Sequence, residues 1–246
     1  MSRSIWAALR NCWRQNERPA DQECRLSALS GRPQLDLTGP AQVLSRLPGA
    51  NLHLVWHDLN PVPTDAGFSI LPTTRLADLP SPDLICIPGG MGVSDVIDDA
   101  AALAWVRQAG EQAAWVTSVC TGALILGAAG LLNGYRATTH WAWQEFLPLF
   151  GAEAVSARTV FDRNRVTGGG VTAGIDFALA LVSRLAGEAT ARTIQLALEY
   201  DPAPPFDAGS PEKAGADTVA AYRDRANRLA PDRAEKMRAA ATRLGF

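Results

Sequence analysis

A cysteine that ends an apolar stretch and precedes small residues has the setting of a nucleophile. Residues 113–119 (AAWVTSV) are apolar and strand-like, Cys120 follows them, and a helix-compatible stretch begins at Thr121. A tight strand–turn–helix connection lifts its central side chain above the carboxyl edge of a sheet, where open α/β sheets bind ligands. The N-terminus of the helix would also favour a thiolate and lower the pKa of Cys120. We therefore expect a nucleophile, with a buried inert thiol as the alternative.

A glycine-rich loop follows another apolar stretch. Residues 83–88 (DLICIP) predict a buried strand, and residues 88–92 (PGGMG) follow it. Glycines allow the backbone to approach a ligand closely. If the two strands are neighbours, the amides of this loop could face Cys120 and complete an oxyanion hole. The motif by itself is also compatible with a simple turn.

Two polar residues, Asp36 and His140, each have two possible roles that the residues alone do not distinguish. Asp36 lies between leucines in residues 35–40 (LDLTGP), where it could be the N-cap of a helix or a partly buried functional acid. His140 follows two threonines, 20 residues after Cys120, and could be a catalytic base or a packed residue at a strand end. We expect Cys86, inside an apolar strand, to pack in the core, whereas Cys12 and Cys24 carry no signal.

Strand-like and helix-like stretches alternate from about residue 34, which predicts an α/β fold with a largely parallel sheet. The first 33 residues are polar and rich in arginine, and residues 24–29 are a weak strand candidate. We expect strands at 50–58, 83–88, 113–119, 154–160 and 165–167, and helices at 96–112, 121–132, 141–150, 172–185 and 188–200.

The composition of the chain changes after residue 200. A proline-rich segment spans 201–211, and the residues beyond it are charged and mostly helical, with a break near Pro231. We therefore expect an atypical N-terminal segment (1–33), one α/β domain (34–211) and a helical C-terminal extension (212–246).

The composition excludes several classes of protein. The 246 residues are 47% hydrophobic with a formal net charge of −2, which is typical of a globular protein and argues against a dedicated nucleic-acid binder. Four cysteines without a CxxC pair and three histidines argue against a disulfide framework and a zinc site.

The uncharged stretch 112–135 is long enough to span a membrane, but it contains glycines and polar residues, so we expect a buried strand and helix there. The apolar run near the N-terminus is too short for a signal peptide. These features favour a cytoplasmic protein.

Several of these motifs occur together in a known superfamily. Residues 118–122 (SVCTG), 138–141 (TTHW) and 88–90 (PGG) resemble the DJ-1/PfpI superfamily. The resemblance implies a flavodoxin-like three-layer sandwich similar to class I glutamine amidotransferases. Within the superfamily, residues 34–40 (QLDLTGP), 167–176 (TGGGVTAGID) and 198–206 (LEYDPAPPF) are most similar to the isocyanide hydratases. The similarity covers about residues 34–212.

The resemblance implies a role for each matching residue. Cys120 matches the nucleophile and Asp36 the acidic residue beside it. Thr121 matches a residue whose hydroxyl and amide assist the reaction, and Gly90 an amide that faces the nucleophile and the substrate. His140 matches a histidine that is not consistently a base, so we place it outside the reacting pair.

The activity that the resemblance implies is hydration of a small-molecule isocyanide to an N-substituted formamide through a cysteine thioimidate. No metal, nucleotide or redox cofactor and no membrane or nucleic-acid partner is implied, and a homodimer is expected because the superfamily usually dimerises. Two alternatives stay open: another cysteine enzyme of the glyoxalase or amidase type, and a ligand-sensing domain related to AraC-like regulators. Such regulators carry a further DNA-binding region of roughly a hundred residues, whereas 35 residues follow residue 211 here.

Overall fold

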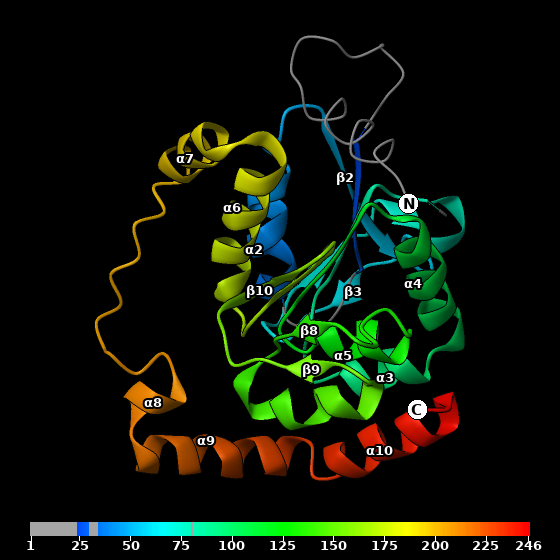
Figure 1. Cartoon of the computed structure of the whole chain (residues 1–246), viewed down its shortest axis with the longest axis vertical. Coiled ribbons are helices and arrows are strands. Elements are labelled where there is room, and N and C mark those ends of the chain that lie inside the picture. Colours follow the sequence, from blue (N-terminus) through cyan, green and yellow to red (C-terminus); the bar gives the residue numbers. More distant parts are fainter. Residues whose placement is uncertain (1–23, 30–33, 80) are drawn as a thin grey trace.

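A seven-stranded sheet runs through the middle of the protein (Figure 1). The computed structural model describes residues 24–29, 34–79 and 81–246. The strand order is β10-β11-β7-β6-β1-β2-β5, and all neighbours are parallel except β10 and β11. The strands are β1 (Cys24–Leu29), β2 (Ala50–Trp56), β5 (Thr74–Arg75), β6 (Leu84–Ile87), β7 (Trp115–Val119), β10 (Thr159–Asp162) and β11 (Arg165–Gly168).

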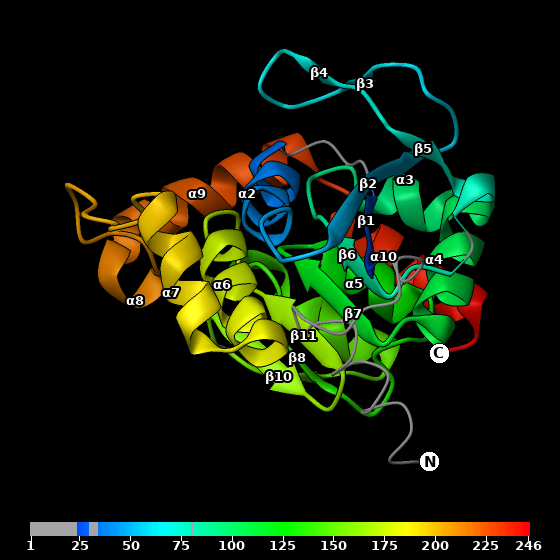
Figure 2. The same cartoon turned by 90° about the horizontal axis from the view of Figure 1, so that it is seen from above.

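Helices cover both faces of this sheet, which confirms the predicted three-layer sandwich (Figures 1 and 2). The smaller apolar core lies under α2 (Gln34–Leu44), α6 (Ala173–Ala186) and α7 (Glu188–Ala197). The larger core lies on the opposite face, under α3 (Val93–Asp98), α4 (Ala100–Gln112), α5 (Gly122–Ala128) and the 3₁₀ segment η2 (Trp141–Phe150). The central strands β6 and β7 are buried on both faces, which explains why they are nearly continuous apolar runs.

Several short elements lie outside the seven-stranded sheet. The two-stranded pair β3 (Val62–Pro63) and β4 (Ser69–Ile70) extends away from the sheet in Figure 2. A second short pair, β8 (Arg136–Ala137) and β9 (Glu153–Ala154), flanks η2, and the 3₁₀ turn η1 spans Leu76–Asp78. Among the described helices, none is both long and apolar enough to cross a membrane, and the uncharged stretch 112–135 contains β7 and α5 as expected.

Several expected elements need correction. The helix expected over 96–112 is two helices, because Asp99 adopts an extended conformation and accepts hydrogen bonds from the backbone N–H groups of Ala101 and Ala102. That geometry is an N-cap, so α4 starts anew after α3. Helix α5 ends at Ala128 rather than residue 132, α7 ends at Ala197 rather than residue 200, and the strand expected over 154–160 is divided between β9 and β10.

The N-terminal prediction is tested only in part. The weak strand candidate at 24–29 forms β1, which lies between β2 and β6. The rest of the segment 1–33, and the side chains of Cys12 and Cys24, lie outside the described residues. The expected division of the chain at residues 33 and 211 stays a prediction.

The C-terminal extension packs onto the domain. Figure 1 shows the segment after α7 running along the outside of the protein to α8 (Pro211–Ala214), followed by α9 (Ala216–Leu229) and α10 (Arg233–Leu244). On α10, Met237, Ala240 and Ala241 are buried in the larger core. This charged segment therefore contributes to the core, because these apolar residues share one face of α10.

Two glycines bring α2 and α6 close together. A Cβ on Gly39 would lie 3.3 Å from the side chain of Ile175, and one on Gly174 would lie 3.1 Å from the ring of Pro40. Close contact between these helices fixes the middle of α2 relative to the first turn of α6. Both segments border the candidate active site.

Candidate active site

Cys120 lies at a sharp turn between β7 and α5, as the sequence predicts. Its φ is +56°, a left-handed conformation that is uncommon for a residue other than glycine. The backbone is held there from two sides. The Cys120 N–H donates to the carbonyls of Gly168 (3.1 Å) and Gly169 (2.8 Å), and the Thr139 hydroxyl donates to the Cys120 carbonyl at 2.7 Å. A strained conformation persists only where the surroundings fix it in this way.

The glycine-rich loop lies directly against this turn. A Cβ on Gly122 would lie 2.0 Å from the Ile87 carbonyl oxygen. A Cβ on Gly89 would lie 2.4 Å from the Thr121 nitrogen and 2.9 Å from the Cys120 Cβ. Side chains at these two positions would push the loop and the turn apart. The glycines are therefore required for the close approach of β6 and β7 at their carboxyl ends.

Thr121 joins the two segments through two hydrogen bonds. Its hydroxyl accepts from the Gly90 N–H at 2.6 Å and donates to the Gly90 carbonyl at 2.9 Å, and the side chain is buried. The resemblance implies a Gly90 amide that faces the nucleophile and the substrate. In the structure, the Gly90 N–H donates to the Thr121 hydroxyl instead. The loop amide that lies close to the reacting pair is that of Gly89, which is near the Asp36 carboxylate.

Asp36 is a fully buried carboxylate beside the thiol. It is in the first turn of α2, which already begins at Gln34, so the N-cap alternative is wrong. Among the described residues, neither oxygen has a hydrogen-bond partner of ordinary geometry, although the Cys120 thiol and the Gly89 N–H are close enough to lower the pKa. Burial outweighs both groups and raises the pKa of Asp36 from 3.8 to about 6.

The Cys120 thiol does not have the low pKa expected from its place before a helix. Burial raises its pKa well above the usual 9.0, the negative charge of Asp36 raises it further, and the N–H groups of Thr121 and Val171 lower it. Desolvation is stronger than the helix N-terminus here because the side chain is only 5% exposed. At neutral pH the pair therefore holds a protonated thiol next to an ionised carboxylate.

His140 is not hydrogen-bonded to Cys120 within the described part of the chain. Its Nδ1 accepts from the Ala142 N–H at 3.2 Å, and its ring stacks on Tyr222 with centroids 5.7 Å apart. Burial, with a smaller effect of the Arg233 charge, lowers the pKa of His140 to about 4. The imidazole is thus neutral at physiological pH, and the interpretation that it stands outside the reacting pair agrees with these contacts.

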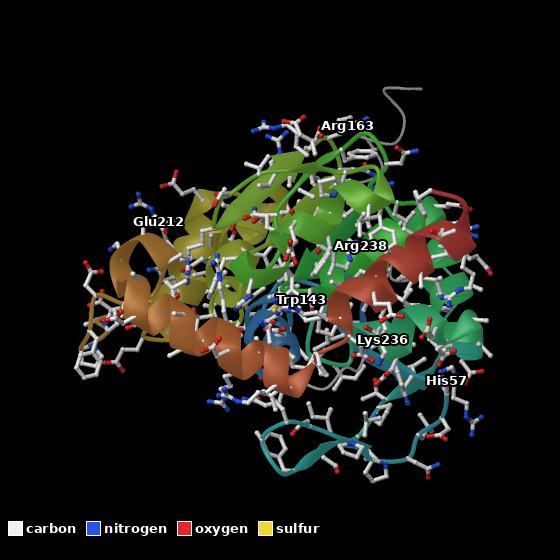
Figure 3. All side chains as sticks on the ribbon, turned by 90° about the horizontal axis from the view of Figure 1, so that it is seen from below. His57, Trp143, Arg163, Glu212, Lys236 and Arg238 are labelled. Carbon is white, nitrogen blue, oxygen red and sulfur yellow. The ribbon has the colours of Figure 1, made fainter. Side chains whose placement is uncertain are left out.

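Two residues near the site were not found from the sequence. The Val171 N–H lies close to the thiol, and the glycines at 168–170 were the available signal. Tyr222 comes from α9, and its ring contacts Trp141 with centroids 5.0 Å apart. Burial raises the pKa of Tyr222, and the charge of Cys120 raises it further. In Figure 3, α9 (orange) and α10 (red) cross the near side of the protein. The sequence did not indicate the contact between Tyr222 and Trp141, because Tyr222 is on a charged helix that lies far along the chain from Cys120.

Cys86 is buried, and burial raises its pKa to about 12, so it packs in the core as predicted. In the described part of the chain, no three His, Cys, Asp or Glu side chains gather in a way that could hold a metal ion.

Known proteins with similar sequences and structures agree with this geometry. A model of the DJ-1/PfpI family matches residues 26–184. An isonitrile hydratase from Pseudomonas putida is 53% identical over 213 residues, which are 87% of this chain and 93% of that protein. The crystal structure of a ThiJ/PfpI family protein from Pseudomonas syringae has a TM-score of 0.82 at 41% identity, covering 94% of this chain and 95% of that one.

A regulator is also similar, over a smaller share of its length. The HTH-type transcriptional regulator GbdR of Pseudomonas aeruginosa is 30% identical over 171 residues, which are 66% of this chain but 45% of the regulator. The similarity thus spans less than half of that protein. The turn at Cys120, the sandwich around it and the match over residues 26–184 lead to one conclusion: this chain belongs to the DJ-1/PfpI family.

Proposed function

We propose that this protein is an enzyme that hydrates isocyanides to N-substituted formamides, with Cys120 as nucleophile and Asp36 as proton carrier. The observation that carries the proposal is the 53% identity to an isonitrile hydratase over 87% of the chain, isonitrile being another name for isocyanide. The buried thiol–carboxylate pair supports the assignment of the two roles.

In the first step, the sulfur of Cys120 attacks the terminal carbon of R–N≡C. The Asp36 carboxylate accepts the thiol proton as the C–S bond forms, and this proton then passes to the same carbon. The product is a thioimidate, R–N=CH–S–Cys120. The Cys120 thiol, with its sulfur and its proton, and the isocyanide together account for every atom, so this step needs no other reactant.

In the second step, Asp36 activates a water molecule for attack on the thioimidate carbon. The C–S bond breaks, the thiol regains a proton, and R–NH–CHO leaves. A raised pKa suits both steps, because a carboxyl group with a pKa of about 6 exchanges protons readily near neutral pH. The overall reaction adds one water and is redox-neutral.

Thr121 and the glycine loop position this pair. The two hydrogen bonds between Thr121 and Gly90 hold the loop against the turn at Cys120, and the Gly89 amide lies close to the carboxylate. We propose that Thr121 assists catalysis by fixing this arrangement, and that Gly90 contributes to substrate binding through the shape of the loop.

A homodimer and a cytoplasmic location are also part of the proposal. The superfamily resemblance favours dimerisation, and four cysteines without a CxxC pair favour a reducing compartment. Light scattering on the purified chain tests the first expectation: a species of 26.2 kDa at micromolar concentration would contradict it.

The direct test is a comparison of substrates. Purified protein is incubated with cyclohexyl isocyanide in the presence of EDTA, and formamide formation is followed by chromatography. Methylglyoxal and a simple amide are offered in parallel, and every assay is repeated with Cys120→Ala. The proposal requires formamide formation that depends on Cys120.

Turnover of methylglyoxal or of the amide without formamide would assign the protein to the second group of cysteine enzymes. No turnover by a folded protein would favour a ligand-sensing role, such as the similarity to the regulator suggests.

A further inference from the structure

A hollow separates η2 from the C-terminal helices α9 and α10. Its volume is about 400 Å³, and its walls are Trp141, Ala142, Glu145, Arg223, Asn227 and Arg233. Neither proposed catalytic step uses any of these side chains.

Two arginines in this hollow lack a carboxylate partner in the described part of the chain. Neither Arg223 nor Arg233 forms an ion pair with any residue that the structure describes, and each lies over an indole instead. The Arg223 guanidinium is 5.8 Å from the ring centre of Trp141, and that of Arg233 is 5.3 Å from the ring centre of Trp143. The Nη1 atom of Arg233 is buried and has no hydrogen-bond partner among the described residues. A buried guanidinium donor without an acceptor is costly, so this nitrogen is suited to a ligand oxygen.

The charges in the hollow favour a ligand with a single negative charge. Two arginines and one glutamate leave a net charge of about +1 in its walls. A carboxylate carries one negative charge and matches the planar fork of a guanidinium, whereas a phosphate dianion would leave an excess of negative charge. The amide of Asn227 offers a further donor, and the face of Trp141 can hold an apolar group next to the anion.

The hollow lies near the nucleophile. A neighbouring hollow of about 450 Å³ shares Trp141 and Arg223 with it. The walls of this second space include Thr139 and Gly169, and both hydrogen-bond the backbone of Cys120. Tyr222 contacts Trp141, which lines both hollows, with ring centroids 5.0 Å apart. The two hollows therefore have a common aromatic wall.

We propose that the hollow containing Arg223 and Arg233 binds the carboxylate end of the substrate, so that preferred isocyanides carry a carboxylate at the end of an apolar spacer. This inference rests on the proposed isocyanide hydration and adds to it the class of R group. Arg223 and Arg233 are then residues that determine specificity, and they take no part in proton transfer.

The test uses a series of ω-isocyanoalkanoates with spacers of increasing length, each paired with its methyl ester. For every pair, the ratio of kcat/KM for the acid to kcat/KM for the ester is measured on the full chain. We expect this ratio to exceed ~10 at one preferred length, because a charge-assisted hydrogen bond contributes on that scale. The preferred length then reports the reach from Cys120 to the arginines.

Variants show which side chains cause the preference. Arg233→Gln and Arg223→Gln should each lower the acid-to-ester ratio by ~10-fold or more, with the change mainly in KM. Arg233→Lys keeps the charge and should restore part of the ratio. Arg228→Gln is the matched control, because Arg228 is also on α9 and does not line the hollow.

The outcomes separate this inference from the proposed function. A ratio near one at all lengths, or a ratio that both glutamine variants leave unchanged, overturns the carboxylate site while hydration of the esters stands. Free hexanoate that alters ester turnover without competing, together with a ratio near one, would assign the site to an independent anion and also overturn the inference. Absence of formamide from acids and esters alike overturns the proposed function and this inference with it.

Discussion

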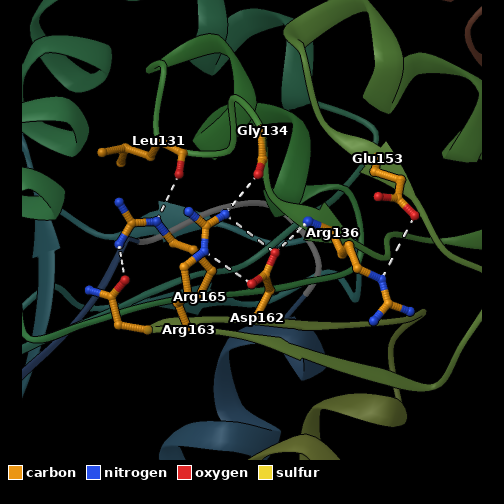
Figure 4. A network of polar contacts seen from close by, with 8 residues as sticks. Leu131, Gly134, Arg136, Glu153, Asp162, Arg163 and Arg165 are labelled. Atoms are coloured by element: carbon orange, nitrogen blue, oxygen red, sulfur yellow. Dashed lines mark hydrogen bonds and ion pairs between the residues drawn. The ribbon is translucent and has the colours of Figure 1, made fainter.

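Two carboxylates at opposite ends of the central strands differ in their hydrogen-bond and ion-pair partners. At the edge where β11 begins, Asp162 accepts from the Arg136 N–H at 2.8 Å and pairs with Arg163 at 3.1 Å (Figure 4). The surrounding arginines are also satisfied: Arg163 donates to the Gly134 carbonyl and Arg165 to the Leu131 carbonyl, each at 2.7 Å. At the carboxyl edge, Asp36 is buried next to a thiol and has no such partner among the residues that the structure describes.

A left-handed residue other than glycine occurs at each of these edges, so backbone conformation alone does not distinguish them. Arg163 has a φ of +54° in the turn between β10 and β11, and its side chain is 57% exposed. Cys120 has a φ of +56° but is buried. A turn residue at the surface needs no functional explanation. The functional signal is the combination of strain, burial and an unpaired acid.

The largest effect should come from removing the nucleophile. Cys120→Ala should lower the rate of formamide formation by on the order of 10³-fold or more, because the variant lacks the sulfur that forms the proposed thioimidate. Steady-state assays by chromatography measure the loss, and Asp162→Asn serves as control for a change at the opposite edge. Substantial turnover by the alanine variant would contradict covalent catalysis.

The next effect concerns the proton carrier. Asp36→Asn should lower turnover by about 10²-fold, since an amide cannot accept the thiol proton. In the wild type, kcat/KM should fall as the pH drops through about 6, where Asp36 becomes protonated. The asparagine variant should lack this step in its pH profile. An unchanged profile would assign the titration to another group.

The same substitution should stabilise the protein at neutral pH. The pKa of Asp36 is higher in the folded state than in the unfolded chain, so ionisation costs stability above about pH 6 and the cost disappears as the pH falls towards 3.8. Asp36→Asn removes a penalty on the order of 2–3 kcal/mol at pH 7. Urea denaturation at pH 7 and pH 4.5 measures the difference, which should be smaller at the lower pH.

A smaller effect is expected for the contact between the loop and the turn. Thr121→Val leaves the buried N–H of Gly90 without the Thr121 hydroxyl and removes one of the two hydrogen bonds to the Gly90 carbonyl, which also accepts from the Val93 N–H at 3.3 Å. This loss should cost about 1–3 kcal/mol of stability. A shifted loop should also reduce turnover by ~10-fold or more. Thr121→Ser keeps the hydroxyl and should retain most of both properties. A loss in Thr121→Ser, with wild-type properties in Thr121→Val, would show that the methyl group, and not the hydrogen bonds, matters.

The smallest effect should occur at the paired edge. Asp162→Asn breaks an ion pair whose arginine is exposed, so the melting temperature should fall by at most ~3 °C and turnover should stay at the wild-type level. Arg163 lowers the pKa of Asp162, which gives this carboxyl the opposite pH dependence: its contribution is present at neutral pH and is lost on acidification. A loss of activity in this variant would break the contrast between the two edges.

The sequence predicted those features that depend on neighbours along the chain. The apolar strand before Cys120 and the small residues after it specify the turn, and alternating apolar stretches specify the sheet. The capped break at Asp99 was also local, yet the periodic alanines and leucines around it concealed it.

Features that depend on distant contacts were not predictable. Whether Asp36 is a cap or a buried acid depends on β6 and β7, which lie far along the chain. The high pKa of Cys120 is a consequence of burial, and a helix start seen in sequence says nothing about solvent exposure. Tyr222 is on a mostly polar helix, so only the folded chain could place it near the site.

The packing of α10 has a consequence for how the protein folds while it is being synthesised. The larger core includes Met237, Ala240 and Ala241, whereas its other members come from residues 55–152. A ribosome adds residues one by one, and domains fold when their parts have emerged. The smaller core, which ends at Ile194, can close during translation. The larger one keeps an open apolar surface until α10 leaves the ribosome, so a nascent chain stalled before residue 233 should be a chaperone substrate.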